Sequence, residues 1–194
     1  CIRDGSRIIA GQAKGRRIRV PESLTRPTSD RAREGLFSSL EARFGLSGEV
    51  VLDLFAGSGA LGLEAASRGA TEVTMVESHS GAVKAITHNM GVVGHNNTRV
   101  VEAKVGSFLA GAPRNHYTMV LADPPYDVAD DAVADMLNTL IPTLTKDAVV
   151  VVERPSAGPE TAWPEGFEPT GQKVKKRTFG IARFDMAIWR GHEN

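Results

Sequence analysis

A chain of 194 residues with 41% apolar residues can bury one sizeable core without needing a second full domain, and its net charge is zero although the charge is unevenly distributed. The single Cys1 and five scattered His residues exclude an internal disulfide and a Cys/His metal centre, which favours a reduced, cytoplasmic setting and a site without metal. No apolar run approaches the roughly 20 residues of a membrane span and no signal-peptide pattern opens the chain, but the first residue is Cys1, not Met, which favours a start further upstream.

Positive charge is concentrated at the beginning of the chain. The first 33 residues carry nine Lys and Arg residues against three acidic residues. This excess favours an anionic polymer as partner, although a solvated basic surface that binds nothing in particular is the alternative. The candidate RNA contacts are Arg7, Lys14, Arg16, Arg17, Arg19, Arg26 and Arg31.

A small hairpin and a helix are expected in this basic region. Residues 7–10 and 16–20 alternate polar and apolar side chains around a glycine-containing turn, which predicts a β-hairpin with its charged face outward. A helix is expected from about residue 31 to 43, with Ser29 or Asp30 as its N-cap and an apolar stripe that docks it on the core.

From residue 50 onward, strands and helices alternate. Helices are expected after residue 60, at about 80–92 and at 129–141, and strands at 50–54, 73–76, 98–101, 119–122 and 148–152. Strands this apolar are typical of a parallel sheet that helices cover on both faces. Beyond Pro155, residues 172–177 and 181–190 flank Gly180 and predict a closing antiparallel hairpin.

A carboxylate and a glycine turn end the strand at 50–54. Gly57 and Gly59 allow a positive φ and a close approach of a ligand to the backbone, beside the exposed N–H groups of the next helix. The spacing Gly57-x-Gly59-x-x-Gly62 also matches the dinucleotide pattern, so the turn alone does not name the cofactor. Asp53 repels pyrophosphate but suits the ammonium and sulfonium of S-adenosylmethionine, which favours this methyl donor.

An acidic residue also ends the following strand. Glu77 lies 24 residues after Asp53, where a carboxylate at the sheet edge can accept both hydroxyls of a ribose. The alternative is a solvated acid at the end of a strand. Its position relative to the glycine turn favours the ribose contact.

The second constellation is Asp123-Pro124-Pro125-Tyr126, directly after the strand at 119–122. Two prolines fix the backbone and turn carbonyls outward, Asp123 supplies an acceptor, and Tyr126 supplies a planar face. This set suits an amino group on a planar ring, because the amine nitrogen is oriented and its developing positive charge is stabilised while the ring stacks on Tyr126. A proline-rich turn with a capping Asp is the alternative.

These motifs together resemble the class I S-adenosylmethionine-dependent amino-methyltransferases. More narrowly, residues 7–11, 15–16, 26–37 and 53–62 resemble the RsmD-type methyltransferases of small-subunit ribosomal RNA. The resemblance implies a Rossmann-like α/β fold with a mostly parallel seven-stranded sheet and an antiparallel C-terminal hairpin. It implies a basic, RNA-binding extension over residues 1–45 and a methyltransferase domain over residues 46–194.

The resemblance also implies a reaction and its partners. The expected reaction is direct, in-line methylation of N2 of one guanine of 16S ribosomal RNA, position 966 in the usual RNA numbering, with S-adenosylhomocysteine as product. The resemblance places the substrate in the small subunit or an assembly intermediate. The sequence itself, which has neither an apolar patch that signals an obligate dimer nor a membrane-spanning run, predicts a monomer away from membranes.

Site residues are carried over by motif. Lys104 stands where such enzymes often place Asp or Asn near the adenine, so the Val105 backbone is the expected substitute. The expected catalytic residues are Asp123, Pro124, Pro125 and Tyr126, and the expected cofactor contacts are Asp53, Phe55, Ala56, Gly57, Ser58, Gly59, Glu77, Ser78 and Val105.

Four other functions share part of this pattern. DNA adenine-N6 methyltransferases have the Asp-Pro-Pro-Tyr motif but usually carry a target-recognition region, and protein glutamine-N5 methyltransferases typically have Asn in place of Asp123. A nicotinamide-dependent oxidoreductase explains the glycine turn but neither Asp53 nor the two prolines. A non-catalytic RNA-binding module explains only the basic region.

Overall fold

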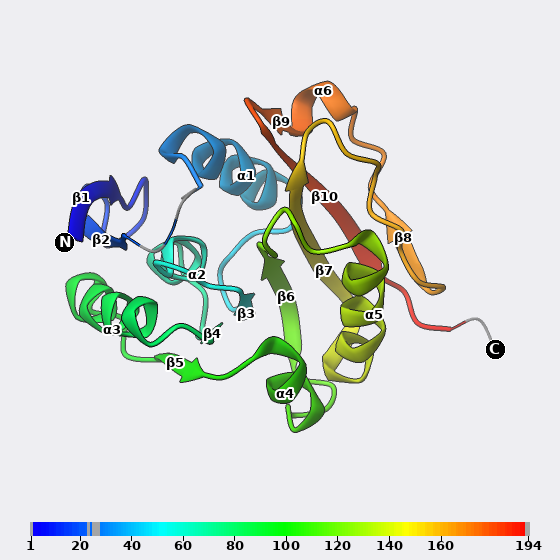
Figure 1. Ribbon diagram of the computed structural model, residues 1–194, viewed down its shortest axis with the longest axis horizontal. Helices are drawn as coiled ribbons and strands as arrows, with labels where there is room; N and C mark the ends of the chain where they lie inside the picture. The colour runs from blue at the N-terminus through cyan, green and yellow to red at the C-terminus, as the bar shows by residue number, and fades with distance from the viewer. Residues whose placement is uncertain (1, 23, 25–27, 193–194) are drawn as a thin grey trace.

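The protein, as a computed structural model that describes residues 2–22, 24 and 28–192, is built around one twisted sheet (Figure 1). The strands lie in the order β5-β4-β3-β6-β7-β10-β8, and the short β9 pairs with β10. The first five of these are mutually parallel, whereas β10 is antiparallel to β7, β8 and β9. The strands are β3 (Val50–Leu54), β4 (Glu72–Glu77), β5 (Thr98–Glu102), β6 (Tyr117–Ala122), β7 (Leu144–Pro155), β8 (Phe167–Pro169), β9 (Thr178–Phe179) and β10 (Ala182–Trp189).

Helices cover both faces of this sheet, as the apolar strands predict. Helices α1 (Asp30–Arg43), α2 (Ala60–Ser67) and α3 (Ser80–Val93) contribute to one apolar cluster with alternate residues of the strands, such as Val51 and Leu121. Helices α4 (Val105–Ala110) and α5 (Asp130–Leu140) contribute to the cluster on the opposite face. A short 3-10 helix, η1 (Ile141–Thr143), directly follows α5. The sheet therefore has two buried faces, and its strand ends remain open for a site.

The helix expected at 31–43 is confirmed as α1. The Ser29 hydroxyl accepts the Ala32 N–H at 3.1 Å, which is the expected N-cap. Leu36, Phe37 and Leu40 are buried in the core, so the helix docks on the sheet as expected.

The N-terminal hairpin forms, but its first arm differs from the expectation. The two strands are β1 (Ile2–Arg7) and β2 (Arg17–Pro21). The first strand was expected at residues 7–10, but the observed β1 already ends at Arg7. The reason is a contact that sequence alternation does not register: the N–H groups of Ile9 and Ala10 donate to the Glu64 carboxylate of α2 at 2.8 and 3.1 Å. The segment after β1 is therefore bound to α2.

The C-terminal end of the sheet also differs in one arm. The antiparallel closure and the arm at 181–190 are confirmed by β10, which pairs along its length with β7. The arm expected at 172–177 is wrong, because a helical turn, α6 (Val174–Arg177), occupies it. The buried Arg177 side chain donates to Asp185 of β10 at 3.3 Å and to Glu160 at 2.8 Å, which fixes this turn against the sheet.

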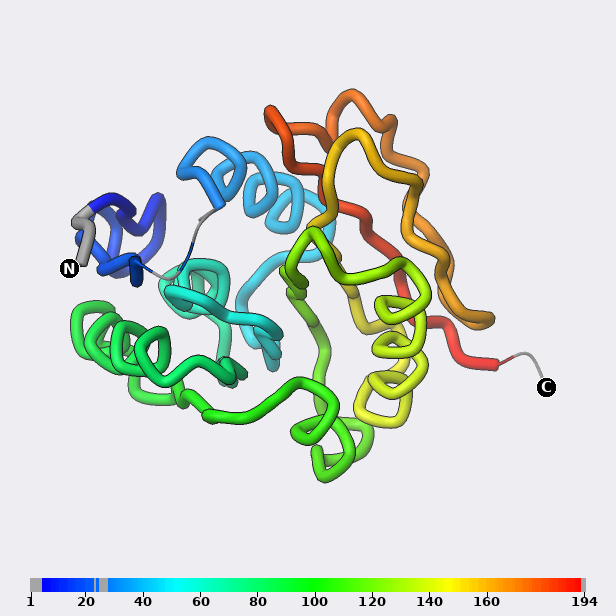
Figure 2. Tube along the Cα trace, in the orientation of Figure 1, coloured from blue at the N-terminus to red at the C-terminus, as the bar shows by residue number. Residues whose placement is uncertain are grey.

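Figure 2 shows the course of the chain in the same orientation, with α1 between the N-terminal hairpin and the segment from α6 to β10. On the side of α1 that faces the hairpin, the fully buried Arg33 donates to the Arg7 carbonyl at 2.6 Å. On the other side of α1, Gly35 lies against the Phe179 ring, and a Cβ added to Gly35 would come within 2.2 Å of a ring atom. No helix in the described part of the chain has the length and apolarity needed to cross a membrane.

Candidate functional site

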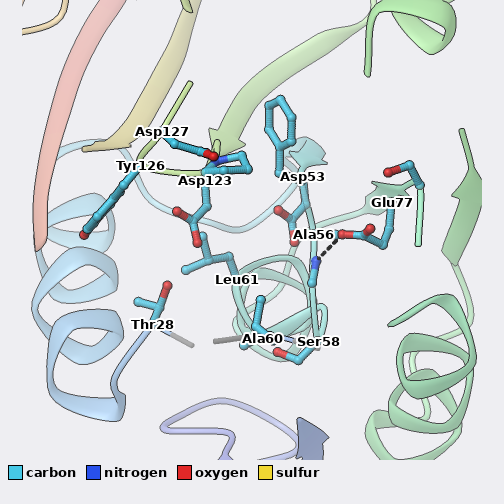
Figure 3. Close-up of a pocket in the computed structure, with 15 residues that line it drawn as sticks. Thr28, Asp53, Ala56, Ser58, Ala60, Leu61, Glu77, Asp123, Tyr126 and Asp127 are labelled. Atoms are coloured by element: carbon cyan, nitrogen blue, oxygen red, sulfur yellow. Dashed lines mark hydrogen bonds between the residues drawn. The ribbon is translucent and has the colours of Figure 1, made fainter. Parts of the chain in front are cut away.

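The carboxyl ends of β3, β4 and β6 surround a cavity of about 640 Å³ (Figure 3). The cavity brings together both constellations that the sequence singles out, the turn after Asp53 and the loop after Asp123. Of the expected cofactor and catalytic residues, all line this cavity except Pro124, Gly59 and Val105. Leu24, Thr28, Ala60, Leu61 and Asp127 line it as well, and the sequence analysis did not single them out.

The turn between β3 and α2 has an unusual backbone. Phe55, Gly57 and Gly59 adopt positive φ angles of 57°, 59° and 79°. A positive φ is readily adopted by glycine but costs energy for Phe55, so this conformation is strained at one residue. Gly59 is the N-cap of α2, and a Cβ added there would meet Met75 and Ile86 in the core.

Asp53 is a buried acid with half of its carboxylate unsatisfied. Its Oδ2 atom accepts the Gly62 N–H at 2.9 Å, and its Oδ1 atom meets no hydrogen-bond partner among the described residues. The pKa of Asp53 is raised to about 8, mainly because burial disfavours the charged carboxylate. The hydrogen bond from the Gly62 N–H lowers this pKa, and the nearby charge of Glu77 raises it further. A cationic group that reached Oδ1 would stabilise the ionised carboxylate. The donor set therefore fits the ammonium of an amino-acid-like ligand.

Glu77 is held rigidly at the end of β4. Its Oε1 atom accepts the Gly57 N–H at 3.0 Å, the contact drawn in Figure 3, and its Oε2 atom accepts the His79 N–H at 2.8 Å. Each carboxylate oxygen can accept a second hydrogen bond. Glu77 can therefore receive ribose hydroxyls without losing the contacts that position it.

The loop after β6 is tied to distant parts of the chain. The Asp123 N–H donates to the Leu54 carbonyl at 3.2 Å, and the Tyr126 hydroxyl donates to the Ile181 carbonyl at 3.4 Å. The guanidinium of Arg154 in β7 donates to the Pro125 carbonyl at 3.3 Å and to the Val128 carbonyl at 2.8 Å. Figure 3 shows the carboxylates of Asp123 and Asp53 directed into the same cavity.

Arg154 is a site-supporting residue that the sequence analysis missed. Its side chain is only 6% exposed, and it also lies 3.5 Å from the Asp130 carboxylate at the start of α5. Arg154 lies two residues beyond the strand expected at 148–152, and its charge alone predicts an exposed side chain, whereas a buried Arg needs several acceptors. Those acceptors lie 26 and 29 residues earlier in the chain, and the sequence does not identify them.

Val105 lines a neighbouring, largely apolar cavity of about 560 Å³. This cavity shares the lining residues Phe55, Glu77 and Ser78 with the first one, so the two cavities adjoin at the end of β4. Val105 lies in the first turn of α4, where backbone N–H groups have no partner within the helix. Lys104 precedes that helix and is exposed.

The expected RNA contacts have different surroundings. The Arg16 guanidinium donates to the carbonyls of Val92 and Val93 at 3.0 and 3.1 Å and thereby caps the C-terminus of α3. Arg7, Lys14 and Arg17 are exposed on or beside the hairpin, whereas Arg19 is half-buried and Arg26 lies outside the described residues. Arg31 is exposed on α1 and lines a separate cavity next to Thr28.

Comparisons with known proteins agree with this geometry. The family model described as "Conserved hypothetical protein 95" matches residues 6–188. A protein of Escherichia coli (strain K12) named "Ribosomal RNA small subunit methyltransferase D" is 44% identical over 123 residues, and the match spans 62% of this chain and 60% of that protein. The Haemophilus influenzae protein of the same name is 32% identical over 93% of this chain and 92% of its own length.

Solved structures share the fold. The Escherichia coli protein yhhF superimposes with a TM-score of 0.79 at 31% identity, over 95% of this chain and 98% of its own. TrmN from Thermus thermophilus has the same fold at a TM-score of 0.65, with 22% identity over 81% of this chain and 48% of its own. The Rossmann-like methyltransferase fold expected from the motifs is therefore confirmed. Because the family model covers most of the sequence, this chain belongs to the "Conserved hypothetical protein 95" family, the RsmD-type methyltransferases.

Proposed function

We propose that this chain methylates ribosomal RNA of the small subunit, with S-adenosylmethionine as the methyl donor and N2 of guanine 966 of 16S RNA as the acceptor. The names of the matched relatives support the class of reaction and the class of substrate. The observation that carries the proposal is that the Asp53 and Asp123 carboxylates, from two separate motifs, are directed into one cavity.

The donor half of the cavity suits S-adenosylmethionine, which when bound supplies a methyl group on a positively charged sulfur. Asp53 would hold the ammonium with its unpaired Oδ1 atom, and Glu77 would hold the ribose. The adenine would occupy the adjoining apolar cavity beside Phe55 and Val105. An ionised Asp53 would repel a pyrophosphate but attract an ammonium, and this disfavours the nicotinamide alternative.

The acceptor half suits an exocyclic amine. Asp123 would accept an N–H of the guanine N2 amine together with the Pro124 carbonyl and would stabilise the positive charge that develops on that nitrogen. Tyr126, whose hydroxyl is bonded to the Ile181 carbonyl, would present its ring to the flipped base. Positioning and electrostatics then supply the rate acceleration, without a covalent protein intermediate or a metal.

The basic side chains of the N-terminal hairpin and Arg31 would contact the RNA backbone. Lys14, Arg17 and Arg31 are exposed, which suits phosphate contacts, whereas Arg16 is engaged by α3. In this proposal residues 1–45 form the RNA-binding extension of the domain at 46–194, and one protomer acts alone on the subunit or its assembly intermediate.

One experiment tests the proposal against its alternatives. The protein is incubated with labelled S-adenosylmethionine and either free 16S RNA or small subunits that lack the modification, and the labelled nucleotide is mapped by mass spectrometry. Label on N2 of guanine 966 is expected. Calorimetric binding of NAD but not of S-adenosylhomocysteine would contradict the proposal, and so would label found only on DNA adenine or on a protein glutamine.

A further inference from the structure

A second groove opens beside the candidate active site, between the start of α1 and the segment from α6 to β10. It has a volume of about 640 Å³, and Thr28 lines both this groove and the active-site cavity. Its cationic lining residues are Arg31 of α1 and Lys175 and Lys176 of α6. None of the proposed RNA contacts lies on α6, so these two lysines have no role in the account above.

The three cations are exposed and carry no structural duty that the described contacts reveal. In the described part of the chain, the ion pairs within 4.0 Å include none with Arg31, Lys175 or Lys176. The contrast with Arg177 is sharp, because this next residue of α6 is buried and paired with Asp185 and Glu160. The lysines therefore form a positive rim that is available to an external anion.

A groove residue, Ile181, forms a hydrogen bond with the loop of the candidate active site. The Ile181 carbonyl accepts both the Ser156 N–H of the chain after β7 at 2.8 Å and the Tyr126 hydroxyl at 3.4 Å. The Ile181 side chain itself is 65% exposed at the groove. Phe179 on β9 packs against Gly35 of α1, so the two walls of the groove are in direct contact.

The floor of the groove restricts where an anion can lie. Glu153 of β7 is buried there and accepts the Thr28 hydroxyl at 3.0 Å. A carboxylate offers a phosphate acceptor oxygens and no donor, so phosphates are favoured at the rim, next to the three cations. An RNA strand can meet this restriction if its backbone runs along the rim. Its target nucleotide then turns away from the rim toward Thr28, which also lines the active-site cavity.

We infer that this groove holds the RNA backbone adjacent to the target nucleotide, with Arg31, Lys175 and Lys176 facing its phosphates. The inference rests on the proposed function and extends it, because it places RNA on both sides of α1, from the N-terminal hairpin to α6. Most of the affinity of proteins for nucleic acids comes from such phosphate contacts, and each contact adds to the salt dependence of binding.

The test compares a double charge reversal within α6 with a single reversal at Lys173, the residue that precedes this helix. Lys175→Glu/Lys176→Glu alters the groove rim, whereas Lys173→Glu alters an exposed lysine that lines a different cavity with Glu160 and Glu165. Binding of a fluorescent 16S RNA fragment that contains guanine 966 is measured by anisotropy across a salt series. Affinity for S-adenosylhomocysteine, measured by calorimetry, reports whether the fold and the donor half are intact.

The double reversal is expected to weaken RNA binding about tenfold or more and to reduce the slope of log affinity against log salt by about two, with Lys173→Glu close to wild type. The neutral variant Lys175→Gln/Lys176→Gln is expected to show a smaller loss of the same kind, and unchanged S-adenosylhomocysteine affinity is expected throughout. Such neutral lysine replacements at exposed positions keep the test valid if the double reversal fails to fold.

Three results would overturn the inference. If wild type methylates the RNA but the double reversal binds like Lys173→Glu, the groove does not hold RNA although the proposed function stands. If the loss appears only with whole subunits and not with the RNA fragment, a ribosomal protein occupies the groove instead. If wild type binds S-adenosylhomocysteine but methylates no RNA, the proposed function and the inference fail together.

Discussion

The two halves of the candidate site are held in place in different ways. In the donor half, Asp53 is fixed by the Gly62 N–H in the first turn of α2 and Glu77 by the Gly57 N–H of the glycine turn, over sequence separations of 9 and 20 residues. In the acceptor half, the loop after Asp123 is fixed by Arg154 and by the Ile181 carbonyl, over separations of 29 and 55 residues. The donor half is therefore a local unit of two neighbouring strand ends, whereas the acceptor half depends on assembly of the whole sheet.

This difference separates the expected effects of substitutions. Changes in the donor half should alter cofactor affinity, and changes in the acceptor half should alter the methylation rate at saturating cofactor. A variant that alters both to the same degree would break the distinction between the two halves.

The largest expected effect is on the rate, from Asp123→Ala. Removal of one preorganised catalytic hydrogen bond is expected to lower single-turnover methylation of the RNA by about a hundredfold or more, while S-adenosylhomocysteine affinity is nearly unchanged. Asp131→Ala, which removes an exposed acid on α5, is the matched control and should act like wild type. A near-wild-type rate for Asp123→Ala would remove this residue from the mechanism.

The next effect is on cofactor affinity, from Asp53→Asn. Asn keeps an acceptor for the Gly62 N–H but loses the charge that would bind the ligand ammonium, so S-adenosylhomocysteine affinity should fall about tenfold or more. Isothermal titration calorimetry of S-adenosylhomocysteine into each protein measures this affinity. Asp147→Asn, on an exposed acid of β7, is the control, and equal affinities for both variants would contradict the ammonium contact.

Asp53 also predicts a pH dependence. Because the folded-state pKa of about 8 lies above the ordinary value of 3.8, the folded protein binds more protons between these values, and ligand-free stability should decrease as pH rises toward about 8. Affinity for a cationic ligand should rise over the same range, since the ligand requires the ionised carboxylate. Thermal unfolding and calorimetry across pH check both trends, and Asp53→Asn should flatten both. Parallel pH curves for the variant and wild type would assign the trends to another group.

A smaller effect on rate is expected from Arg154→Met. This change removes both donors that hold the loop carbonyls of Pro125 and Val128, so Asp123 is less well positioned and the rate should fall about tenfold, with unchanged S-adenosylhomocysteine affinity. Arg190→Met is the control, because Arg190 forms exposed ion pairs of little energetic value. Equal losses of cofactor affinity and rate would show that Arg154 supports the fold as a whole.

The smallest effect is on stability, from Arg16→Gln. Loss of its hydrogen bonds to the last carbonyls of α3 should lower the free energy of unfolding by about 1 kcal/mol. Arg17→Gln, one residue away and exposed, should leave stability unchanged and lower only RNA affinity. Denaturant unfolding distinguishes the two, and identical midpoints would contradict a structural role for Arg16.

The residues that the sequence proposes for the donor half lie together around one cavity, because the signals that identify them are local. A carboxylate, two glycines and a second carboxylate at the next strand end are enough to place Asp53, Gly57 and Glu77 around one cavity. The Asp123 loop was equally visible, because two consecutive prolines after an apolar strand are a local pattern. In both cases the topology of a parallel sheet brings the strand ends together.

The remaining features depend on contacts between distant residues. The cap that Arg16 places on α3 and the support that Arg154 gives to the loop join residues 76 and 29 positions apart, and alternation of polar and apolar residues does not encode either partner. The first strand of the N-terminal hairpin was misplaced because Ile9 and Ala10 bond to Glu64.

The six-residue helix α4 was missed for a different reason, because it is too short to show a helical period.

A structure of the protein with S-adenosylhomocysteine bound would test most directly whether the donor half and the acceptor half face each other across the reacting sulfur. The account predicts the ligand ammonium on Asp53, the ribose on Glu77 and the sulfur facing the Asp123 carboxylate across a space that fits a flipped base. A ligand bound elsewhere, or one whose sulfur is separated from Asp123 by side chains of the protein, would contradict the account.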